Sequence, residues 1–346
     1  MHLNKAVIPH YQCETIPIEK LKRRVSLNEA YLREKPTWYE IEGKLQYFKI
    51  RNDFRLFTEQ FFSMFGREIL GIDTLDYEVA YIRAKDSKLR EVKDITKCGL
   101  LSENFQTPEY NYYLVSELLN AQISDFKAYG GYTLENLLRF FKDYLDKEEY
   151  KENELFLIKL FIADGFTHQE DRNYNNIGFK IPKIENIPFT KRLHPELLTA
   201  YREAEGSYVI NEDGRILLKD FTPTKVYDSE RILGTDHRNV FTYKKDSVWC
   251  PLFPYSEDTL FENEEEAKIA QKKYDGLDPN LVELYMNYPD ICRPIFERLA
   301  YESEYKKILE RFEGDNSQIH LSSSSEERII SLLEDKQENL KRILTL

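Results

Sequence analysis

The sequence predicts an α+β protein whose N-terminal half is rich in strands and whose C-terminal half is helical. Strand-like stretches follow one another up to Val115, and apolar residues at helical spacing dominate from about residue 117 onward. The length of 346 residues exceeds one average domain, which favours two domains or two lobes around one cleft. We therefore expect two parts, residues 1–117 and 118–346.

The N-terminal part contains a predicted β-hairpin over Thr37–Ile50, closed by a tight Glu-Gly-Lys turn. A helix follows, with Thr58 as its expected N-cap, an apolar stripe of phenylalanines, and Gly71 as its C-terminal stop. Strands are then expected over residues 77–82, 89–101 and 110–115.

The C-terminal part is predicted to be helical around one irregular region. The last helix is expected from Glu326 to Leu344, with the serine run before it as its cap. Residues 181–243 are rich in Pro, Lys and Glu and resemble an insertion. The other expected elements are helices over 118–124, 133–145 and 153–163, and strands over 177–180 and 248–253.

The composition excludes several classes of function. The net charge of -12 argues against nucleic acid as a direct ligand, because phosphate binding depends on clustered Lys and Arg. No window reaches the apolar length that spans a bilayer, and the N-terminal residues lack the features of a signal peptide. The four cysteines have no metal-binding spacing. We expect a cytoplasmic protein with reduced cysteines and no membrane partner.

The segment most indicative of chemistry is 163–179, which lies between a buried helix and a short strand and contains Asp171 and Asn176. Phosphoryl transfer needs a carboxylate that accepts the proton of the attacking hydroxyl and a nearby amide oxygen that holds magnesium. A D-x-x-x-x-N loop supplies both. An upstream lysine on a strand, followed by a glutamate on a helix, completes the order found in kinases. The alternative is that Asp171 and Asn176 only form the turn between helix and strand.

These motifs resemble those of the HipA-like serine/threonine kinases, which include HipA toxin-like and CtkA-like bacterial kinases. Asp171-Arg172-Asn173 and Asn176-Ile177-Gly178-Phe179 are similar to the family's catalytic loop, and Leu45-Gln46-Tyr47-Phe48-Lys49 is similar to the strand with its nucleotide-binding lysine. Outside the long insertion, the resemblance covers roughly residues 38–261. It implies a bilobal protein-kinase-like fold with ATP bound between the lobes, near 114–118.

The resemblance also implies roles for individual residues. Lys49 would contact the phosphates of ATP, and Glu59 would orient that lysine, with Glu68 as the weaker alternative. Asp171 would be the base, and Asn176 would hold Mg²⁺. No G-x-G-x-x-G motif occurs in the first hairpin, so backbone amides around Gly43 are the candidates for covering the phosphates.

One element departs from the family's pattern. Pro251–Phe253 resembles the turn before the metal-binding aspartate, but Pro254 stands at the aspartate's position. Glu257 and Asp258 follow a few residues later and are candidates for the missing ligand. Asp220, which precedes a phenylalanine after a strand-like stretch, is their rival.

The expected function is therefore ATP- and Mg²⁺-dependent phosphorylation of a protein serine or threonine, the protein itself included as a substrate. Two alternatives remain open. The departure at Pro254 favours a pseudokinase that acts as an interaction module without phosphate transfer. Related two-lobed folds also phosphorylate small molecules with the same lysine and aspartate, so a small-molecule phosphotransferase is the other alternative.

Overall fold

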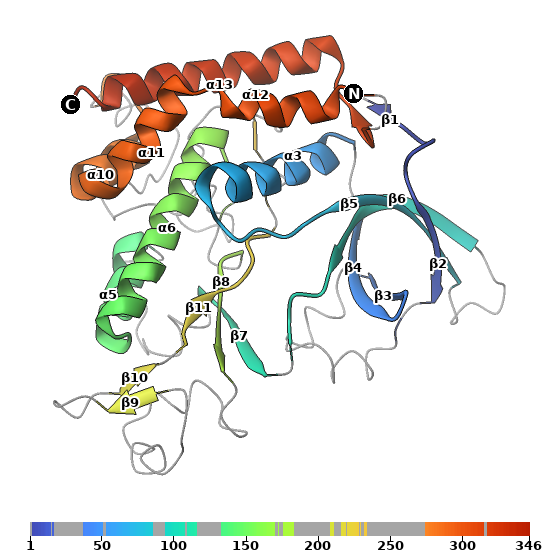
Figure 1. The fold of residues 1–346 in the computed structure, drawn as a ribbon, viewed down its shortest axis with the longest axis horizontal. Helices are drawn as coiled ribbons and strands as arrows, with labels where there is room; N and C mark the ends of the chain where they lie inside the picture. Colours follow the sequence, from blue (N-terminus) through green and yellow to red (C-terminus); the bar gives the residue numbers. More distant parts are fainter. Residues whose placement is uncertain are drawn as a thin grey trace, which may run out of the picture.

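The computed structural model of the chain has a curled N-terminal sheet beside a helical C-terminal region (Figure 1). This arrangement confirms the α+β fold class. The predicted boundary at residue 117 falls outside the described residues. The structure describes residues 2–14, 16, 37–50, 53–85, 94–107, 109–115, 133–169, 172, 176–182, 208–210, 216–218, 220–227, 229, 232–233, 274–314 and 317–346.

The N-terminal sheet has five strands in the order β2-β5-β6-β4-β3, and only β2 and β5 are parallel neighbours. The predicted hairpin is confirmed as β3 and β4, joined by Glu42 and Gly43 at φ 52° and 78°. Two residues with positive φ suit the twist of a two-residue hairpin. The strands are β2 (His10–Glu14), β3 (Thr37–Ile41), β4 (Lys44–Ile50), β5 (Glu78–Lys85) and β6 (Asp94–Glu103).

Helix α3 (Asp53–Met64) continues into a π-helical turn, η1 (Phe65–Leu70), and both contact the C-terminal helix α12, which lies beside α3 in Figure 1. Gly71 ends this helix in the left-handed conformation at φ 64°, as predicted. The predicted N-cap at Thr58 is wrong. Thr58 is fully buried inside the helix, and its hydroxyl donates to the carbonyl of Arg55.

A second sheet has the order β11-β8-β7, formed by β7 (Tyr110–Leu114), β8 (Gly178–Pro182) and β11 (Thr222–Pro223). Strand β11 pairs antiparallel with β8, so its two residues are part of this sheet. Phe221 is fully buried beside the ring of Phe179, at a centroid distance of 5.0 Å. Part of the segment 181–243, predicted as an insertion, thus contributes a strand and a core residue to the described structure. Strands β9 (Tyr208–Ile210) and β10 (Ile216–Leu218) pair with each other.

Helices α5 (Leu134–Tyr144) and α6 (Lys147–Thr167) begin the helical region, as predicted, although α6 is longer than expected at both ends. Ser322, in the serine run predicted to cap the last helix, accepts the N–H of Ser325, but the helix begins at Ser323 and not at the predicted Glu326. The predicted helix over 118–124 and the strand over 248–253 lie outside the described residues. The later elements are α10 (Pro279–Asn287), α11 (Pro289–Tyr301), α12 (Glu304–Leu309), η5 (Glu310–Phe312) and α13 (Ser323–Ile343).

The C-terminal helices also contact the N-terminal part. Strand β12 (Ile319–His320) pairs with β1 (His2–Leu3).

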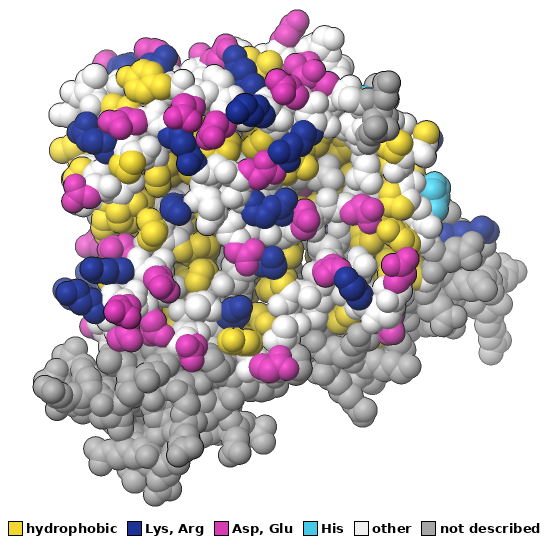
Figure 2. Space-filling model, viewed as in Figure 1, with side chains coloured by type: hydrophobic (Ala, Val, Ile, Leu, Met, Phe, Trp, Pro, Cys, Tyr) yellow, Lys and Arg dark blue, Asp and Glu magenta, His cyan; other side chains and the backbone are white. Residues whose placement is uncertain are grey.

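On the face shown in Figure 2, acidic and basic side chains are interspersed around scattered hydrophobic ones. No helix in the described ranges is long and apolar enough to cross a membrane.

Candidate active site

The centre of the candidate site is an ion pair between the N-terminal sheet and helix α3. Lys49 on β4 donates from Nζ to Oε1 of Glu59, and their side chains are only 7% and 0% exposed. Burying two charges is costly unless they are close and hydrogen-bonded. The backbone beside Lys49 is equally tightly packed, because a Cβ on Gly99 of β6 would lie 2.4 Å from the carbonyl oxygen of Lys49.

The second oxygen of Glu59 has a partner from a distant part of the chain. The backbone N–H of Ser229 donates to Oε2 of Glu59 at 3.0 Å, and Ser229 is only 2% exposed. Glu59 therefore accepts from the lysine ammonium with one oxygen and from the Ser229 backbone with the other. Charge-assisted bonds of this kind are among the stronger hydrogen bonds in proteins.

Arg172 forms the other half of the site and is fully buried. Its Nε and Nη2 donate to the two carboxylate oxygens of Asp164, near the end of α6, at 3.0 and 3.1 Å. Nη1 donates to the carbonyl of Tyr227 at 3.0 Å, and Nη2 also donates to Oγ of Ser229 at 2.9 Å. Burial raises the pKa of the Asp164 carboxyl, and the Arg172 guanidinium opposes that rise.

The segment 224–229 connects these groups to the second sheet. The N–H of Thr224 donates to the carbonyl of Gly178 at 2.9 Å, which extends the pairing of β11 with β8. Val226 forms a parallel bridge with Thr74, and its N–H donates to the carbonyl of Asp73 at 2.9 Å. The segment thus lies between β8 and the stretch that follows η1.

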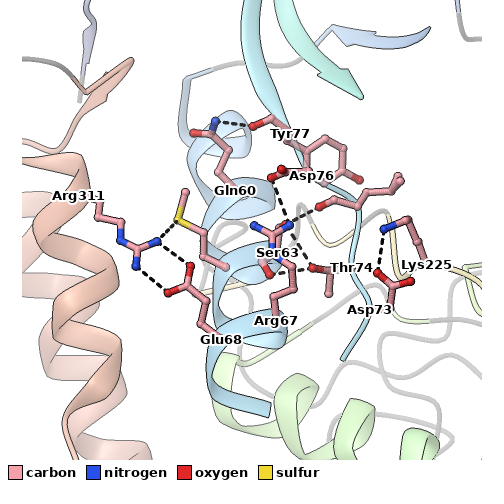
Figure 3. A network of polar contacts seen from close by, with 12 residues as sticks. Gln60, Ser63, Arg67, Glu68, Asp73, Thr74, Asp76, Tyr77, Lys225 and Arg311 are labelled. Atoms are coloured by element: carbon pink, nitrogen blue, oxygen red, sulfur yellow. Dashed lines mark hydrogen bonds and ion pairs between the residues drawn. The ribbon is translucent and has the colours of Figure 1, made fainter. Parts of the chain in front are cut away.

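Figure 3 shows how that stretch is bonded to helix α3. Gln60 donates to the carbonyl of Tyr77 at 3.0 Å, and the hydroxyl of Thr74 donates to the carbonyl of Ser63 at 2.8 Å. A Cβ on Gly66 would lie 2.8 Å from the Thr74 side chain, so η1 requires a residue without a side chain there. The helix that carries Glu59 and the segment that carries Ser229 are therefore both bonded to residues 73–77.

Among the predicted site residues, the structure brings Lys49 and Glu59 into contact. Glu68, the weaker alternative to Glu59, instead binds Arg311 with both oxygens at 2.6 Å on the surface. Asn176 is 4% exposed and lies just before β8. Asp171 directly precedes Arg172 in the chain but lies outside the described residues, as do Glu257 and Asp258.

Gly43 does not lie beside Lys49. It occupies the exposed turn before β4, roughly 20 Å along the strand from Lys49 at about 3.3 Å per residue. The prediction that its backbone amides cover the phosphates is therefore not supported by this arrangement, because the strand separates the turn from the lysine.

Asp220 is also remote from the site. Its N–H donates to Oε1 of Glu149 in the first turn of α6, whereas Asp164 lies near the helix end. A rise of 1.5 Å per residue separates Glu149 from Asp164 by about 22 Å. Asp220 also has φ 55° and an exposed side chain. The structure does not bring it together with Lys49, Glu59 or Asn176.

The sequence-based prediction missed Asp164 and Ser229, and it assigned no role to Arg172. It also passed over Asp228, which lies outside the described residues but stands in the chain between Tyr227 and Ser229, both of which contact Arg172. An available signal was Val226-Tyr227-Asp228-Ser229, an apolar pair followed by an aspartate, downstream of the D-x-x-x-x-N loop and a strand. The interpretation of 181–243 as an insertion hid this signal.

Comparisons with known proteins gave similarities in structure only. No family model matches the chain, and no curated protein matches it. Among solved structures, the chain is similar to the Helicobacter pylori proinflammatory kinase CtkA, with 13% identity, a TM-score of 0.46, and coverage of 90% of this chain and 93% of that one. It is also similar to a HipA in a toxin–antitoxin complex of Shewanella oneidensis MR-1 with HipB and operator DNA. That match has 11% identity, a TM-score of 0.48, and coverage of 99% of this chain and 76% of that one.

Proposed function

We propose that this protein is a phosphotransferase that uses ATP and Mg²⁺ to phosphorylate serine or threonine side chains of proteins, its own included. The buried ion pair between Lys49 and Glu59 carries the proposal. In protein kinases a strand lysine must pair with a helix glutamate before the lysine can hold the nucleotide phosphates. A pair of charges enclosed by a sheet and a helix is costly to bury, so a function that requires it is the simplest reason for its presence.

Each residue then has a defined task. The Lys49 ammonium binds the phosphate oxygens of ATP, and Glu59 directs it. Asp171 accepts the proton of the attacking hydroxyl, and Asn176 supplies an amide oxygen as a ligand for Mg²⁺. When bound, Mg²⁺ neutralises charge on the phosphates, and the buried position of Asn176 beside β8 fits a ligand held by the fold.

The second magnesium ligand that we propose is Asp228. Its chain neighbours Tyr227 and Ser229 both contact the buried arginine that follows Asp171 in the chain. It also follows β11, the strand paired with β8, as the metal-binding aspartate of kinases follows its own strand. An aspartate at this position removes the reason to regard Pro254 as a loss of the metal ligand.

The test is transfer of labelled γ-phosphate from ATP by the full chain with Mg²⁺, to itself and to an unstructured protein acceptor. Asp171→Asn and Asp228→Asn are compared with Asp220→Asn, an exposed aspartate far from Lys49. We expect Asp171→Asn to lose about 10²–10⁴-fold in rate, the range for a removed general base. Asp228→Asn should also lose transfer, because it removes a proposed magnesium ligand, and Asp220→Asn should match wild type.

Three results would contradict the proposal. Unchanged transfer by Asp171→Asn would show that Asp171 is not the base. ATP binding by wild type without any transfer would favour the pseudokinase. Transfer to small hydroxyl compounds but to no protein would instead favour a small-molecule phosphotransferase.

A further inference from the structure

A continuous line of buried contacts runs from helix α6 to strand β4. Asp164 binds Arg172, Arg172 donates to Ser229, and the Ser229 N–H donates to Glu59. Glu59 in turn accepts from Lys49. The members are between 0% and 7% exposed: Arg172 0%, Glu59 1%, Asp164 1%, Ser229 2% and Lys49 7%.

Ser229 connects the two halves of this line of contacts, because it bonds to Arg172 and to Glu59 through different atoms. Its hydroxyl accepts from Arg172 at 2.9 Å, and its backbone N–H occupies Oε2 of Glu59 at 3.0 Å. With Oε2 bound to the backbone, the carboxylate presents Oε1 to Lys49. A displaced Ser229 would allow the carboxylate to turn, and the lysine would then turn with it.

Arg172 restrains Ser229 through several bonds. It accepts no hydrogen bond itself but offers five donors in a rigid plane. Two atoms are held by Asp164, another reaches the carbonyl of Tyr227, and the plane lies over the ring of Phe62 on α3, 5.3 Å from its centroid. The chain around Ser229 is thus bonded on both sides to a group that α6 anchors.

We propose that Asp164 and Arg172 are positioning residues for the phosphate-contacting lysine, acting through Ser229 and Glu59. The inference rests on the proposed function, since it assigns Lys49 to the nucleotide. It makes the direction of the lysine depend on helix α6 of the other part of the molecule, and not on the N-terminal sheet and α3 alone.

The rival explanation is that Asp164 and Arg172 only stabilise the fold, and a paired apolar replacement separates the two. Removing one partner of a buried ion pair leaves a buried charge, whereas replacing both by apolar residues is often neutral. Asp164→Leu combined with Arg172→Met should therefore unfold near the wild-type temperature. If the pair positions Lys49, this variant should nevertheless bind ATP about tenfold more weakly than wild type. The charge-assisted contact between the Lys49 ammonium and the ATP phosphates would then be lost.

Binding is measured by calorimetry with ATP in EDTA, so that neither catalysis nor the metal enters the readout. The same paired replacement is then made in the Lys49→Met background. The proposal predicts no further loss of ATP affinity there, because the pair acts through the lysine. A matched control replaces the buried hydrogen-bonded pair Tyr305 and Gln337, between α12 and α13, by Phe and Leu, and it should bind ATP like wild type.

Three outcomes would overturn the inference. Wild-type affinity in the paired variant means that Asp164 and Arg172 only stabilise, while the proposed function stands. An equal loss with and without Lys49 means that they act elsewhere in the site. Failure of wild type itself to bind ATP overturns the proposed function and this inference with it. If the paired variant does not fold, Ser229→Ala keeps the backbone donor and removes only the Arg172 acceptor, and it should weaken ATP binding in wild type but not in Lys49→Met.

Discussion

Two arginines contact the helix formed by α3 and η1, and each donates hydrogen bonds from two nitrogens to one carboxylate. Arg172 binds Asp164 at 3.0 and 3.1 Å, and Arg311 binds Glu68 with two bonds of 2.6 Å. Their surroundings differ sharply. The Arg172 and Asp164 side chains are 0% and 2% exposed, whereas Arg311 and Glu68 are 50% and 38% exposed.

The comparison separates geometry from energetics. Exposed ion pairs contribute about 0–1 kcal/mol even when their geometry is good, because water and salt screen them. A buried pair gains more from the low dielectric but must repay the desolvation of both ions. The exposed Glu68–Arg311 pair therefore contributes little to holding the C-terminal helices against η1. The buried Asp164–Arg172 pair at the candidate site needs a reason beyond stability.

The largest expected effect comes from breaking the buried pair on one side. Arg172→Met leaves the Asp164 carboxylate buried without its guanidinium, and we expect a loss of about 3–5 kcal/mol in unfolding free energy. Urea unfolding followed by circular dichroism measures it. A loss under 1 kcal/mol would show that water reaches Asp164 and that the buried pair resembles the exposed one.

A smaller effect is expected from one added methyl group in each region. A Cβ added to Gly99 would lie 2.4 Å from the carbonyl oxygen of Lys49, whereas a Cβ added to Gly314, three residues after Arg311, would meet nothing within 4 Å. Gly99→Ala should destabilise by about 1–3 kcal/mol, the usual cost of overpacking, and weaken ATP binding by moving β4 from β6. Gly314→Ala is the control and should leave both unchanged. Equal unfolding midpoints for the two variants would contradict the packing around Lys49.

Glu149 is an intermediate case, a half-buried carboxylate that accepts the Asp220 N–H. Burial raises its pKa to about 7 from 4.5. Folded protein therefore holds this proton over pH values at which the unfolded chain has lost it, and stability should fall as the pH rises from about 4.5 to 7. Thermal unfolding across this range should show that fall in wild type and a flatter profile in Glu149→Gln. If the stability of wild type instead rose with pH over this range relative to Glu149→Gln, the raised pKa of Glu149 would be contradicted.

The smallest effect should come from the exposed pair. Arg311→Gln removes both bonds to Glu68, and we expect a change of about 0–1 kcal/mol that high salt reduces further. Unfolding in low and high salt measures it. A loss as large as that of Arg172→Met would mean that exposure does not distinguish the two pairs.

Local features of the fold were readable from the sequence, and long-range ones were not. The hairpin turn and the stop at Gly71 depend on backbone conformations that the adjacent residues reveal. Thr58 has the chemistry of a cap, but packing buried it within the helix. Strand β11 was missed because it has two residues and is defined by pairing with β8, which no local pattern shows.

The candidate site divides in the same way. Lys49 and Glu59 lie on consecutive elements, so their order in the chain indicated a pair. Arg172 and Ser229 are brought together by the pairing of distant segments, and an arginine in a loop looks like a solvent-facing one until its burial is known. Asp220 resembled a metal ligand from its neighbours alone, and only the contact of its backbone with Glu149 places it far from the site.

The most direct test of the central claim is Mg²⁺-dependent transfer of γ-phosphate from ATP by the full chain, measured for wild type and Lys49→Met under the same conditions. We expect transfer by wild type and loss of transfer in Lys49→Met, with weaker ATP binding in a variant that still folds. Transfer by Lys49→Met at the wild-type rate, or a wild type that neither binds nor uses ATP, would contradict it.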